Sequence, residues 1–473
     1  MPADPVFFVL LAAVLLGALD QTVVAATLPA IVLDFGLPLN RLDDVAWAIT
    51  AYLAGYALVL PIAGQVADRM HRRDIFACAC LFVFGAGSAA VGLGQDLPTI
   101  VVGRFVQSLG AGALLPMAMG RVSAHGLLEH LVVRIGWVTA VAEGGALLGP
   151  VYGAGMMQLL GWRWVFLVNV PCAAILGWLA LRVERNPERS HDRALDWQGA
   201  VLLGGALGAW TLAMSRELAT LAAGLARPIL LLLGLGLAGT VVLIERRAAA
   251  PLLPRGMLRR DVILITLVIH ALGGAALMAP LLLVPVWGNT LLGEEPAQAA
   301  LLLARLTLTI PLGALLGSRL GVRWPLFALA GAGMALTASA LGLMSHWPAD
   351  IDPQSMTPAL LLAGLGFGLM IAPTNAVAIG AAGLGNAATT ASLVQSARLV
   401  GMTLASAAIA SFGLDQFSAL VADLSVGDAE AYVQAVRGSA HQVFTGQLAW
   451  GSVAAWLGTI TAMIGWARSR RPQ

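Results

Sequence analysis

The chain has no lysine, few charged residues and only three cysteines. Of its 473 residues 11% are charged, and all 27 basic residues are arginine, which leaves a net charge of +2. This balance does not resemble the clustered basic face of a protein that binds nucleic acid. Cys78, Cys80 and Cys172 fall inside apolar stretches, and Cys-Ala-Cys lacks the spacing of a metal or redox motif. We therefore interpret the cysteines as inert packing residues.

The sequence also lacks the motifs of common enzyme sites. It contains no phosphate-binding loop, no serine-centred nucleophile motif and no paired cysteine set. The stretch "HGLLEH" at 125–130 has three residues between its first histidine and the Glu-His pair, where the inverted zinc-binding pattern has two. We expect a protein that is not an enzyme and that needs neither a metal nor a cofactor.

Apolar residues dominate the chain. Hydrophobic residues make up 59% of it, and the mean hydropathy is +0.85, which is too apolar for a soluble globular protein. We therefore expect an all-α integral membrane protein. Spans of about 20 apolar residues predict fourteen transmembrane helices, at about 6–33, 45–64, 74–94, 99–121, 132–158, 164–182, 196–215, 228–245, 262–289, 298–318, 325–344, 357–379, 387–414 and 442–466.

These spans group as six, two and six. The grouping predicts an N-terminal six-helix bundle in 1–190, a two-helix linker hairpin in 191–260 and a C-terminal six-helix bundle in 261–473, with a periplasmic extension at 415–441. In that extension Phe417, Leu420, Val421 and Leu424 recur at helical spacing, as in a helix that guides a lipid tail or one that packs against its neighbour.

Arginine is concentrated in one set of alternate loops, and this bias predicts which loops are cytoplasmic. With an even number of crossings, both termini are then cytoplasmic. The rich set holds Arg69, Arg72, Arg73, Arg121, Arg134, Arg182, Arg185, Arg189, Arg193, Arg246, Arg247, Arg255, Arg259, Arg260, Arg319, Arg323, Arg468, Arg470 and Arg471.

Several charged residues lie inside predicted spans. An unpaired carboxylate such as that of Asp20, in "GALDQTVVAATLPAI", costs about 2.5 to 3.5 kcal/mol at the centre of a membrane helix, so a partner or a function is expected. Arg104, Arg305 and Arg398 are the arginines within spans, and Glu143 is a second buried acid.

Five stretches resemble the major facilitator superfamily. "GQVADRMHRRD" is similar to its cytoplasmic loop motif, "GRFVQSLGAGA" to its R-x-x-Q-G-x-G motif, and "EGGALLGPVYGAG" to its antiporter motif. "GWRWVFLVNVP" and "ALD" are typical of its fourteen-helix drug-proton antiporter branch. Three C-terminal stretches, "LMSHWPADI", "AGLGFGLMIAP" and "SARLVGMTLASAAIASFGL", resemble the mycobacterial-type triacylglycerol and lipid exporters of that branch.

The resemblance implies roles for particular residues. Asp20, Glu143 and Arg398 would form a proton-coupling group, in which a proton and a guanidinium compete for one carboxylate. The loop would be a conformational latch, in which Asp68 caps or pairs with a neighbouring helix; the alternative is that its arginines only set topology. The residues of this latch motif are Gly64, Asp68, Arg69, Arg72 and Arg73. The residues of the antiporter motif are Gly145, Gly149, Pro150 and Gly153.

Other interpretations of the buried charges remain open. A permanent ion pair that fixes helix packing is the alternative to proton coupling. Arg104 either shapes the helix arrangement or holds Asp20 in place, and Arg305 either lines a wet cavity, snorkels near a helix end or binds a ligand. Pro150 frees a backbone carbonyl, and the glycines around it permit close helix contact. We interpret His270 as a packing residue, the alternative being a role in proton transfer.

The resemblance also implies a function. We expect a secondary active exporter of hydrophobic, lipid-like molecules such as triacylglycerol in a bacterial inner (plasma) membrane, which works by alternating access and is driven by the proton gradient. The partners it implies are protons, a lipid substrate and a periplasmic lipid-binding lipoprotein, without nucleic acid. The alternative is a multidrug-proton antiporter for amphipathic drugs and dyes.

Overall fold

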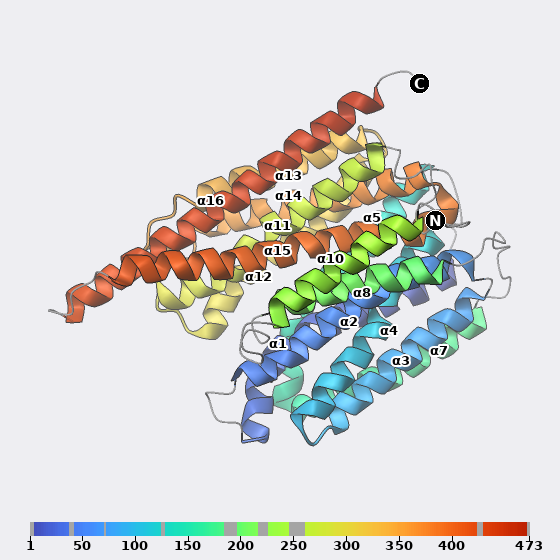
Figure 1. Cartoon of the computed structure of the whole chain (residues 1–473), viewed down its shortest axis with the longest axis horizontal. Helices are drawn as coiled ribbons and strands as arrows, with labels where there is room; N and C mark the ends of the chain where they lie inside the picture. The colour runs from blue at the N-terminus through green and yellow to red at the C-terminus, as the bar shows by residue number, and fades with distance from the viewer. Residues whose placement is uncertain are drawn as a thin grey trace. The chain divides into compact units, whose positions relative to one another are not determined.

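The computed structural model describes residues 4–36, 42–70, 72–123, 128–183, 196–215, 226–245, 261–422 and 429–470. This part of the chain is helical and contains no strand (Figure 1). Its helices are α1 (Pro5–Asp34), α2 (Leu42–Arg69), α3 (Arg73–Leu93), α4 (Leu97–Ser123), α5 (Leu128–Leu160), α6 (Trp162–Leu167), α7 (Asn169–Val183), α8 (Trp197–Ala213), α10 (Ala226–Glu245), α11 (Asp261–Thr290), α12 (Pro296–Leu320), α13 (Leu326–Met344), α14 (Thr357–Ala382), η2 (Leu384–Asn386), α15 (Ala387–Ala422) and α16 (Ala429–Ser469).

Twelve stretches of the described chain are helical, long enough and apolar enough to cross a membrane. They correspond to the twelve predicted spans outside the linker, with α6 and α7 together forming one of them, Trp162–Val183. The predicted linker crossings are α8 and α10. They stand outside this set, because α8 has 17 residues and the apolar stretch of α10 is Ala226–Val241.

The last two helices are longer than their predicted spans. α15 has 36 residues and α16 has 41, which at 1.5 Å per residue gives about 54 and 62 Å. A bilayer core is about 30 Å thick, so both helices extend well beyond it. The predicted extension at 415–441 is therefore helical in the residues that the structure describes, 415–422 and 429–441; its centre, with Leu424, lies outside them.

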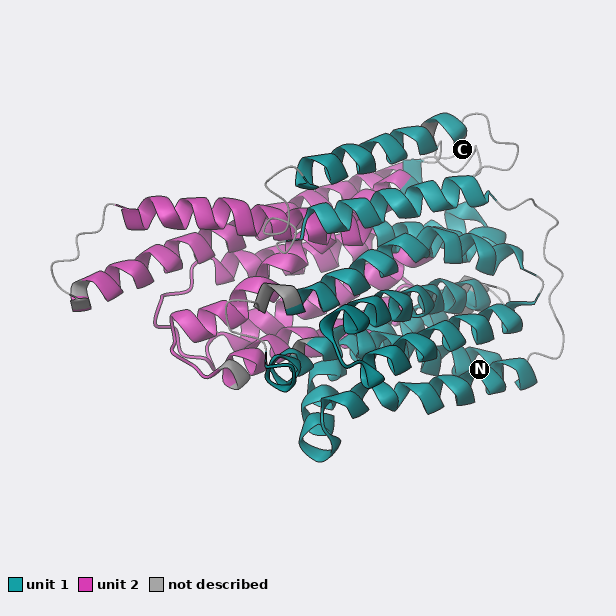
Figure 2. Cartoon of the chain, turned by 60° about the horizontal axis from the view of Figure 1, so that its bottom comes forward, with its two compact units in different colours: residues 1–263, 378–396 teal, residues 264–377, 397–473 magenta. Residues whose placement is uncertain are grey.

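The chain divides into two compact units (Figure 2). The first comprises Met1–Ile263 and Ala378–Ser396, and the second comprises Leu264–Val377 and Ala397–Gln473. In the first unit α1 packs on α5, α2 packs on α4, and α3 packs on α4 and α7. The hairpin of α8 and α10 belongs to this unit, because α8 packs on both α10 and α2. In the second unit α13 packs on α16.

Three glycines of the antiporter motif make the contact between α5 and α1. Gly145, Gly149 and Gly153 are four residues apart and therefore lie on one face of α5. A Cβ atom added at Gly145 would lie 2.7 Å from Ala18 Cβ, and one added at Gly149 would lie 2.6 Å from the carbonyl oxygen of Leu19. Pro150 is exposed and points away from this face. The predicted close packing is therefore confirmed, and its partner is α1.

The hydroxyl of Thr22 compensates for Pro150. Proline has no amide hydrogen, so the carbonyl of Ala146, four residues earlier, loses its helical donor. Thr22 Oγ1 in α1 donates a hydrogen bond of 2.8 Å to this carbonyl oxygen. The freed carbonyl that the sequence predicts is therefore used to join two helices.

Replacing Gly149 by alanine is expected to destabilise the protein. The new methyl group would meet Thr22 Oγ1 and the backbone of α1, which disrupts the bond to Ala146. Overpacking of this kind costs about 1 to 3 kcal/mol, which exceeds the gain of about 1 kcal/mol in helix propensity. Thermal unfolding in detergent measures the change.

Gly155→Ala is the matched control in the same helix, because a Cβ atom added there has no atom within 4 Å. This variant is expected to be as stable as the wild type or more stable. Equal melting temperatures for the two variants would contradict the proposed close contact.

Candidate functional site

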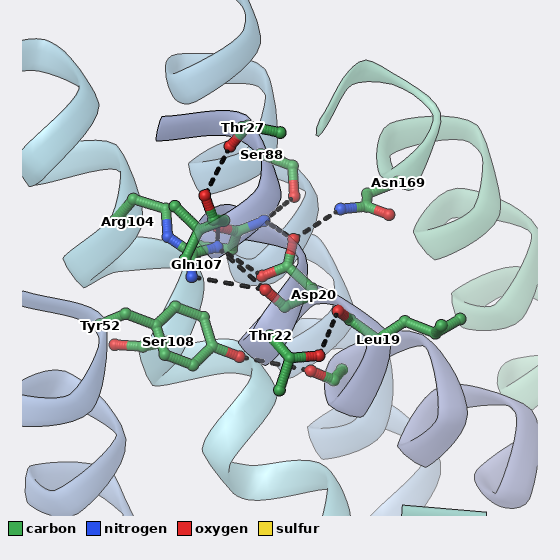
Figure 3. A network of polar contacts seen from close by, with 12 residues as sticks. Leu19, Asp20, Thr22, Thr27, Tyr52, Ser88, Arg104, Gln107, Ser108 and Asn169 are labelled. Carbon is green, nitrogen blue, oxygen red and sulfur yellow. Dashed lines mark hydrogen bonds and ion pairs between the residues drawn. The ribbon is translucent and has the colours of Figure 1, made fainter. Parts of the chain in front are cut away.

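Asp20 forms an ion pair with Arg104 in the interior of the first unit (Figure 3). Arg104 Nη1 lies 2.7 Å from Asp20 Oδ2, and the two residues are 0% and 2% exposed. Asp20 comes from α1 and Arg104 from α4. Of the three arginines inside predicted spans, Arg104 is therefore the partner of Asp20 in this structure.

Two amide side chains complete the coordination of the Asp20 carboxylate. Gln107 Nε2 and Asn169 Nδ2 donate to Asp20 Oδ1 over 2.7 and 2.9 Å. Gln107 Oε1 accepts from Arg104 Nη1 over 2.7 Å, and Gln107 Nε2 also donates to Ser88 Oγ over 2.6 Å. The resulting network joins residues of α1, α3, α4 and α7 without contact to bulk water.

Local sequence explains how these side chains meet. Arg104 and Gln107 are three residues apart, so they lie on the same face of α4. The helix break at Val168 places Asn169 at the first residue of α7. Pro171 contributes to this break, since it cannot donate an amide hydrogen to the carbonyl of Leu167.

The ring of Tyr52 covers the Arg104 guanidinium. The Cζ atom of Arg104 lies 4.1 Å from the ring centroid, which is a cation–π contact, and the hydroxyl donates to the carbonyl oxygen of Gly17 over 3.4 Å. The three side-chain donors around Asp20 fit the ionised carboxylate. A proton on Asp20 would remove the negative charge that holds Arg104.

The sequence analysis did not identify four members of this network. Gln107 and Asn169 lie inside two of the motifs that carry the family resemblance, "GRFVQSLGAGA" and "GWRWVFLVNVP". Those motifs were therefore a usable signal for both residues. Ser88 and Tyr52 had no comparable signal, because a serine or tyrosine in an apolar span is common.

The two other residues of the predicted proton-coupling group, Glu143 and Arg398, have surroundings of their own. Glu143 is half-buried in α5, two residues before Gly145, and is not among the hydrogen-bond partners of Asp20. Arg398 belongs to the second unit, where its guanidinium carbon lies 5.3 Å from the ring centroid of Phe367. The structure therefore brings Asp20 together with Arg104, and it places Arg398 in the environment of α14.

Arg305 binds the beginning of α14. Its Nη1 donates to Thr357 Oγ1 over 2.6 Å and also to the carbonyl oxygen of Pro353. Both partners lie where the connection from α13 enters α14. This contact supports the interpretation that Arg305 extends toward a helix end.

Asp68 of the latch motif caps the first turn of α15. Its Oδ1 accepts from the amide of Ala388 over 2.9 Å, and its Oδ2 accepts from the amide of Thr389 over 2.7 Å. Amides in the first turn of a helix have no acceptor within that helix, and the helix dipole favours an anion there. Gly64, one turn earlier in α2, permits this approach, because an added Cβ atom would lie 2.9 Å from the carbonyl oxygen of Ala388.

The arginines of the latch motif have different neighbours. Arg72 forms a two-pronged ion pair with Asp74, with distances of 3.0 and 2.7 Å, and thereby supports the first turn of α3. Arg73 acts electrostatically on Asp68. Arg69 lies at the last residue of α2, one residue after Asp68. Asp68 and Gly64 are the members of the motif whose approach to α15 is described above.

The Asp68→Asn variant is expected to expose the first amides of α15 to hydrogen exchange. An asparagine oxygen can replace one carboxylate oxygen, but its NH₂ group would face the second amide. Loss of a hydrogen bond to a charged group costs about 1.5 to 3 kcal/mol, so exchange at Ala388 and Thr389 should become roughly ten- to hundredfold faster. Mass spectrometry after deuterium labelling measures this, with Asp415→Asn, an exposed acid of the same helix, as the control. Unchanged protection would show that Asp68 does not hold this turn.

The two ends of α1 carry ion pairs with other helices. Asp4 pairs with Arg121 of α4 over 3.2 Å, and Asp34 pairs with Arg163 of α6 over 2.6 Å. Burial alone would raise the pKa of Asp4, but the Arg121 guanidinium and the amides of Phe7 and Val6 outweigh it and hold the pKa below its ordinary value. Arg121, which belongs to the arginine-rich set of loops, and Arg163, which does not, therefore lie at opposite ends of α1.

Comparison with known proteins identifies the family of this chain. Residues 10–406 match the Major Facilitator Superfamily. A triacylglyceride transporter of Mycolicibacterium hassiacum is 32% identical over 426 residues, which cover 86% of this chain and 78% of that protein. A triacylglyceride transporter of Mycobacterium tuberculosis is 32% identical over 442 residues, which cover 87% of this chain and 83% of that protein.

The fold is also that of a solved transporter structure. The structure of a bacterial homologue of the iron transporter ferroportin, in its outward-facing state, has a TM-score of 0.65 to this chain at 13% identity. The match covers 98% of this chain and 100% of the other, and at this identity it shows the fold alone. From the extent of the family match and the identity to these relatives, the chain is a multi-pass membrane protein that belongs to the major facilitator superfamily of transporters.

Proposed function

We propose that this protein exports hydrophobic, lipid-like molecules such as triacylglycerol across the bacterial inner membrane in exchange for protons. The network around Asp20 is the observation that carries the proposal. The relatives named triacylglyceride transporters support a lipid as the substrate. Transport would proceed by alternating access of two six-helix halves, 1–190 and 261–473. α8 and α10 would form two additional crossings between these halves, for a total of fourteen, and both termini would be cytoplasmic.

Proton coupling follows from the competition at Asp20. Both carboxylate oxygens are occupied, with Arg104 on Oδ2 and Gln107 and Asn169 on Oδ1. A proton that binds to Asp20 removes the negative charge that holds Arg104, so the proton and the guanidinium compete for this carboxylate, and the return of Arg104 favours release of the proton. Gln107 can assist this exchange, since its amide carries both an acceptor and donors. A rearrangement that moves α4 relative to α1 would thus be linked to proton binding.

The energy available from one proton is sufficient. Moving one charge through 100 mV supplies about 2.3 kcal/mol, which corresponds to roughly fiftyfold accumulation of a neutral lipid in one-to-one exchange. Glu143 and Arg398 would take part in the same cycle, as the family resemblance implies.

The long helices α15 and α16 support release on the periplasmic side. Since they extend beyond the thickness of a bilayer core, they would guide a lipid away from the membrane surface. A periplasmic lipid-binding lipoprotein is the partner that would receive the lipid there.

Transport by purified protein in proteoliposomes tests the proposal. An imposed pH gradient is expected to drive accumulation of labelled trioleoylglycerol, and a protonophore is expected to abolish it. A cationic dye serves as the second substrate. Gradient-driven movement of the dye without movement of the lipid would support a multidrug antiporter, and movement of neither would contradict proton-coupled export.

A further inference from the structure

His270 is a fully buried titratable side chain that the exchange at Asp20 does not use. It lies in α11 of the second unit and is 1% exposed. Its Nε2 atom lies 2.7 Å from Thr374 Oγ1 of α14, whereas its Nδ1 atom has no hydrogen-bond partner among the described residues. A packing residue with satisfied polar groups would have partners at both nitrogens. The structure therefore differs from that expectation at Nδ1.

The contacts of Thr374 determine which nitrogen carries the proton. Its hydroxyl has one hydrogen, and Oγ1 lies 2.7 Å from the carbonyl oxygen of Met370 and 3.0 Å from that of Ile371. A carbonyl can only accept, so the hydroxyl hydrogen is directed to α14. Oγ1 must then accept from Nε2–H of His270. The neutral tautomer with its hydrogen on Nε2 fits this arrangement, and it leaves a lone pair on Nδ1 in the interior.

Arg398 is the charged group that acts on His270 in the described part of the chain. It comes from α15, and its guanidinium is held over Phe367 of α14. From the other packed helices, Thr374 of α14 is the hydrogen-bond partner of His270 among the described residues, and Met334 of α13 lies near Gly273, three residues after His270. With Arg398 in place, a second positive charge on the imidazole would be repelled.

The backbones of α11 and α15 are in contact beside this pair. A Cβ atom added at Gly274, one turn after His270, would meet the carbonyl oxygen of Arg398. One added at Gly401, three residues after Arg398, would meet the carbonyl oxygen of Ala271. Because these helices touch through their main chains, a slide or tilt of α15 along α11 changes the separation of Arg398 and His270 directly.

We propose that His270 is a second proton-binding residue of this transporter, which takes up a proton at Nδ1 when Arg398 moves away from it. The Nδ1 lone pair accepts the proton from water and the ring becomes imidazolium, with Nε2–H still donating to Thr374. The return of Arg398 expels the proton to water. This inference rests on the proposed proton-coupled function, and it adds to the exchange at Asp20 a second exchange in the other unit.

Counting the protons that move with each lipid tests the proposal. In proteoliposomes with a known gradient of trioleoylglycerol, one measures the membrane potential at which net movement of the lipid stops. The ratio of the lipid gradient to this potential gives the number of protons per lipid. His270→Gln retains a donor toward Thr374 but cannot bind a proton, so the number is expected to fall by one and accumulation at 100 mV by about fiftyfold. His346→Gln, at an exposed histidine, is the control and should leave the number unchanged. An unchanged number in His270→Gln overturns the proposal.

Nitrogen-15 magnetic resonance of labelled histidine provides a readout that does not depend on transport. The resonance missing from His270→Gln identifies His270, and the wild type is expected to show hydrogen on Nε2 and none on Nδ1 at neutral pH. In Arg398→Gln, Nδ1 should bind a proton at higher pH than in the wild type. A hydrogen on Nδ1 in the wild type, or identical titration in both proteins, overturns the proposal. If wild-type transport instead ignores the proton gradient, the proposed function fails, and the titration still tests His270.

Discussion

The Asp20→Asn variant is expected to lose gradient-driven accumulation of triacylglycerol. Asparagine keeps the size of the side chain and an oxygen that accepts hydrogen bonds, but it cannot bind and release a proton near neutral pH. Each proton exchanged at 100 mV accounts for roughly fiftyfold accumulation, so loss of the exchange at Asp20 should lower accumulation at least fiftyfold. Uptake of labelled trioleoylglycerol by proteoliposomes under a pH gradient and membrane potential measures this loss.

Two further variants separate loss of coupling from loss of fold. Asp34→Asn removes an acid of the same helix that lies 39% exposed at its end and pairs with Arg163, and this variant should accumulate lipid as the wild type does. Asp20→Asn combined with Arg104→Gln removes both buried charges, so it should fold well and still fail to accumulate lipid. Uphill transport by this double variant would contradict the role assigned to Asp20.

The same ion pair predicts a large and unequal effect on stability. Asp20→Asn leaves the fully buried guanidinium of Arg104 without its counter-ion, and removal of one partner of a buried pair costs about 3 to 5 kcal/mol. Arg104→Gln should cost less, because the remaining carboxyl group can take up a proton and become neutral, whereas arginine stays charged. Thermal unfolding in detergent ranks the two variants.

The double variant tests whether the two effects have one origin. If the charge left behind causes the loss, Asp20→Asn with Arg104→Gln should be more stable than Asp20→Asn alone, with an interaction energy of several kcal/mol. Additive losses would show instead that each side chain stabilises the protein through separate contacts. Additive losses would therefore contradict the alternative that a permanent ion pair between Asp20 and Arg104 fixes the packing of the helices.

The class of protein and most of the helices could be predicted from the sequence, because hydropathy is a local property. Twelve of the fourteen predicted spans correspond to helices that are long and apolar enough to cross a membrane. Helix ends were predicted less well. α15 and α16 continue past the apolar residues, since hydropathy marks the edge of the membrane and not the end of the hydrogen-bonded helix.

The site could be predicted in part. Hydropathy identified Asp20 as a charge that requires a partner, and the spans gave three arginines as candidates. The choice of Arg104 depends on which helix lies beside α1 and on how far its side chain reaches, and neither is encoded in a short stretch of sequence. The same holds for Asn169, which reaches Asp20 because the helix breaks at Val168.

The sequence alone determined that this protein lies in a membrane, that its chain is helical, and that a few charges must be buried at particular positions. Only the tertiary structure decided which groups pair with one another. Asp20 pairs with Arg104, Asp68 accepts hydrogen bonds from the first amides of α15, and Thr22 donates to the carbonyl that Pro150 leaves free. The physical reason is that burial follows from the residues next to each position, whereas pairing joins atoms that are far apart in the chain.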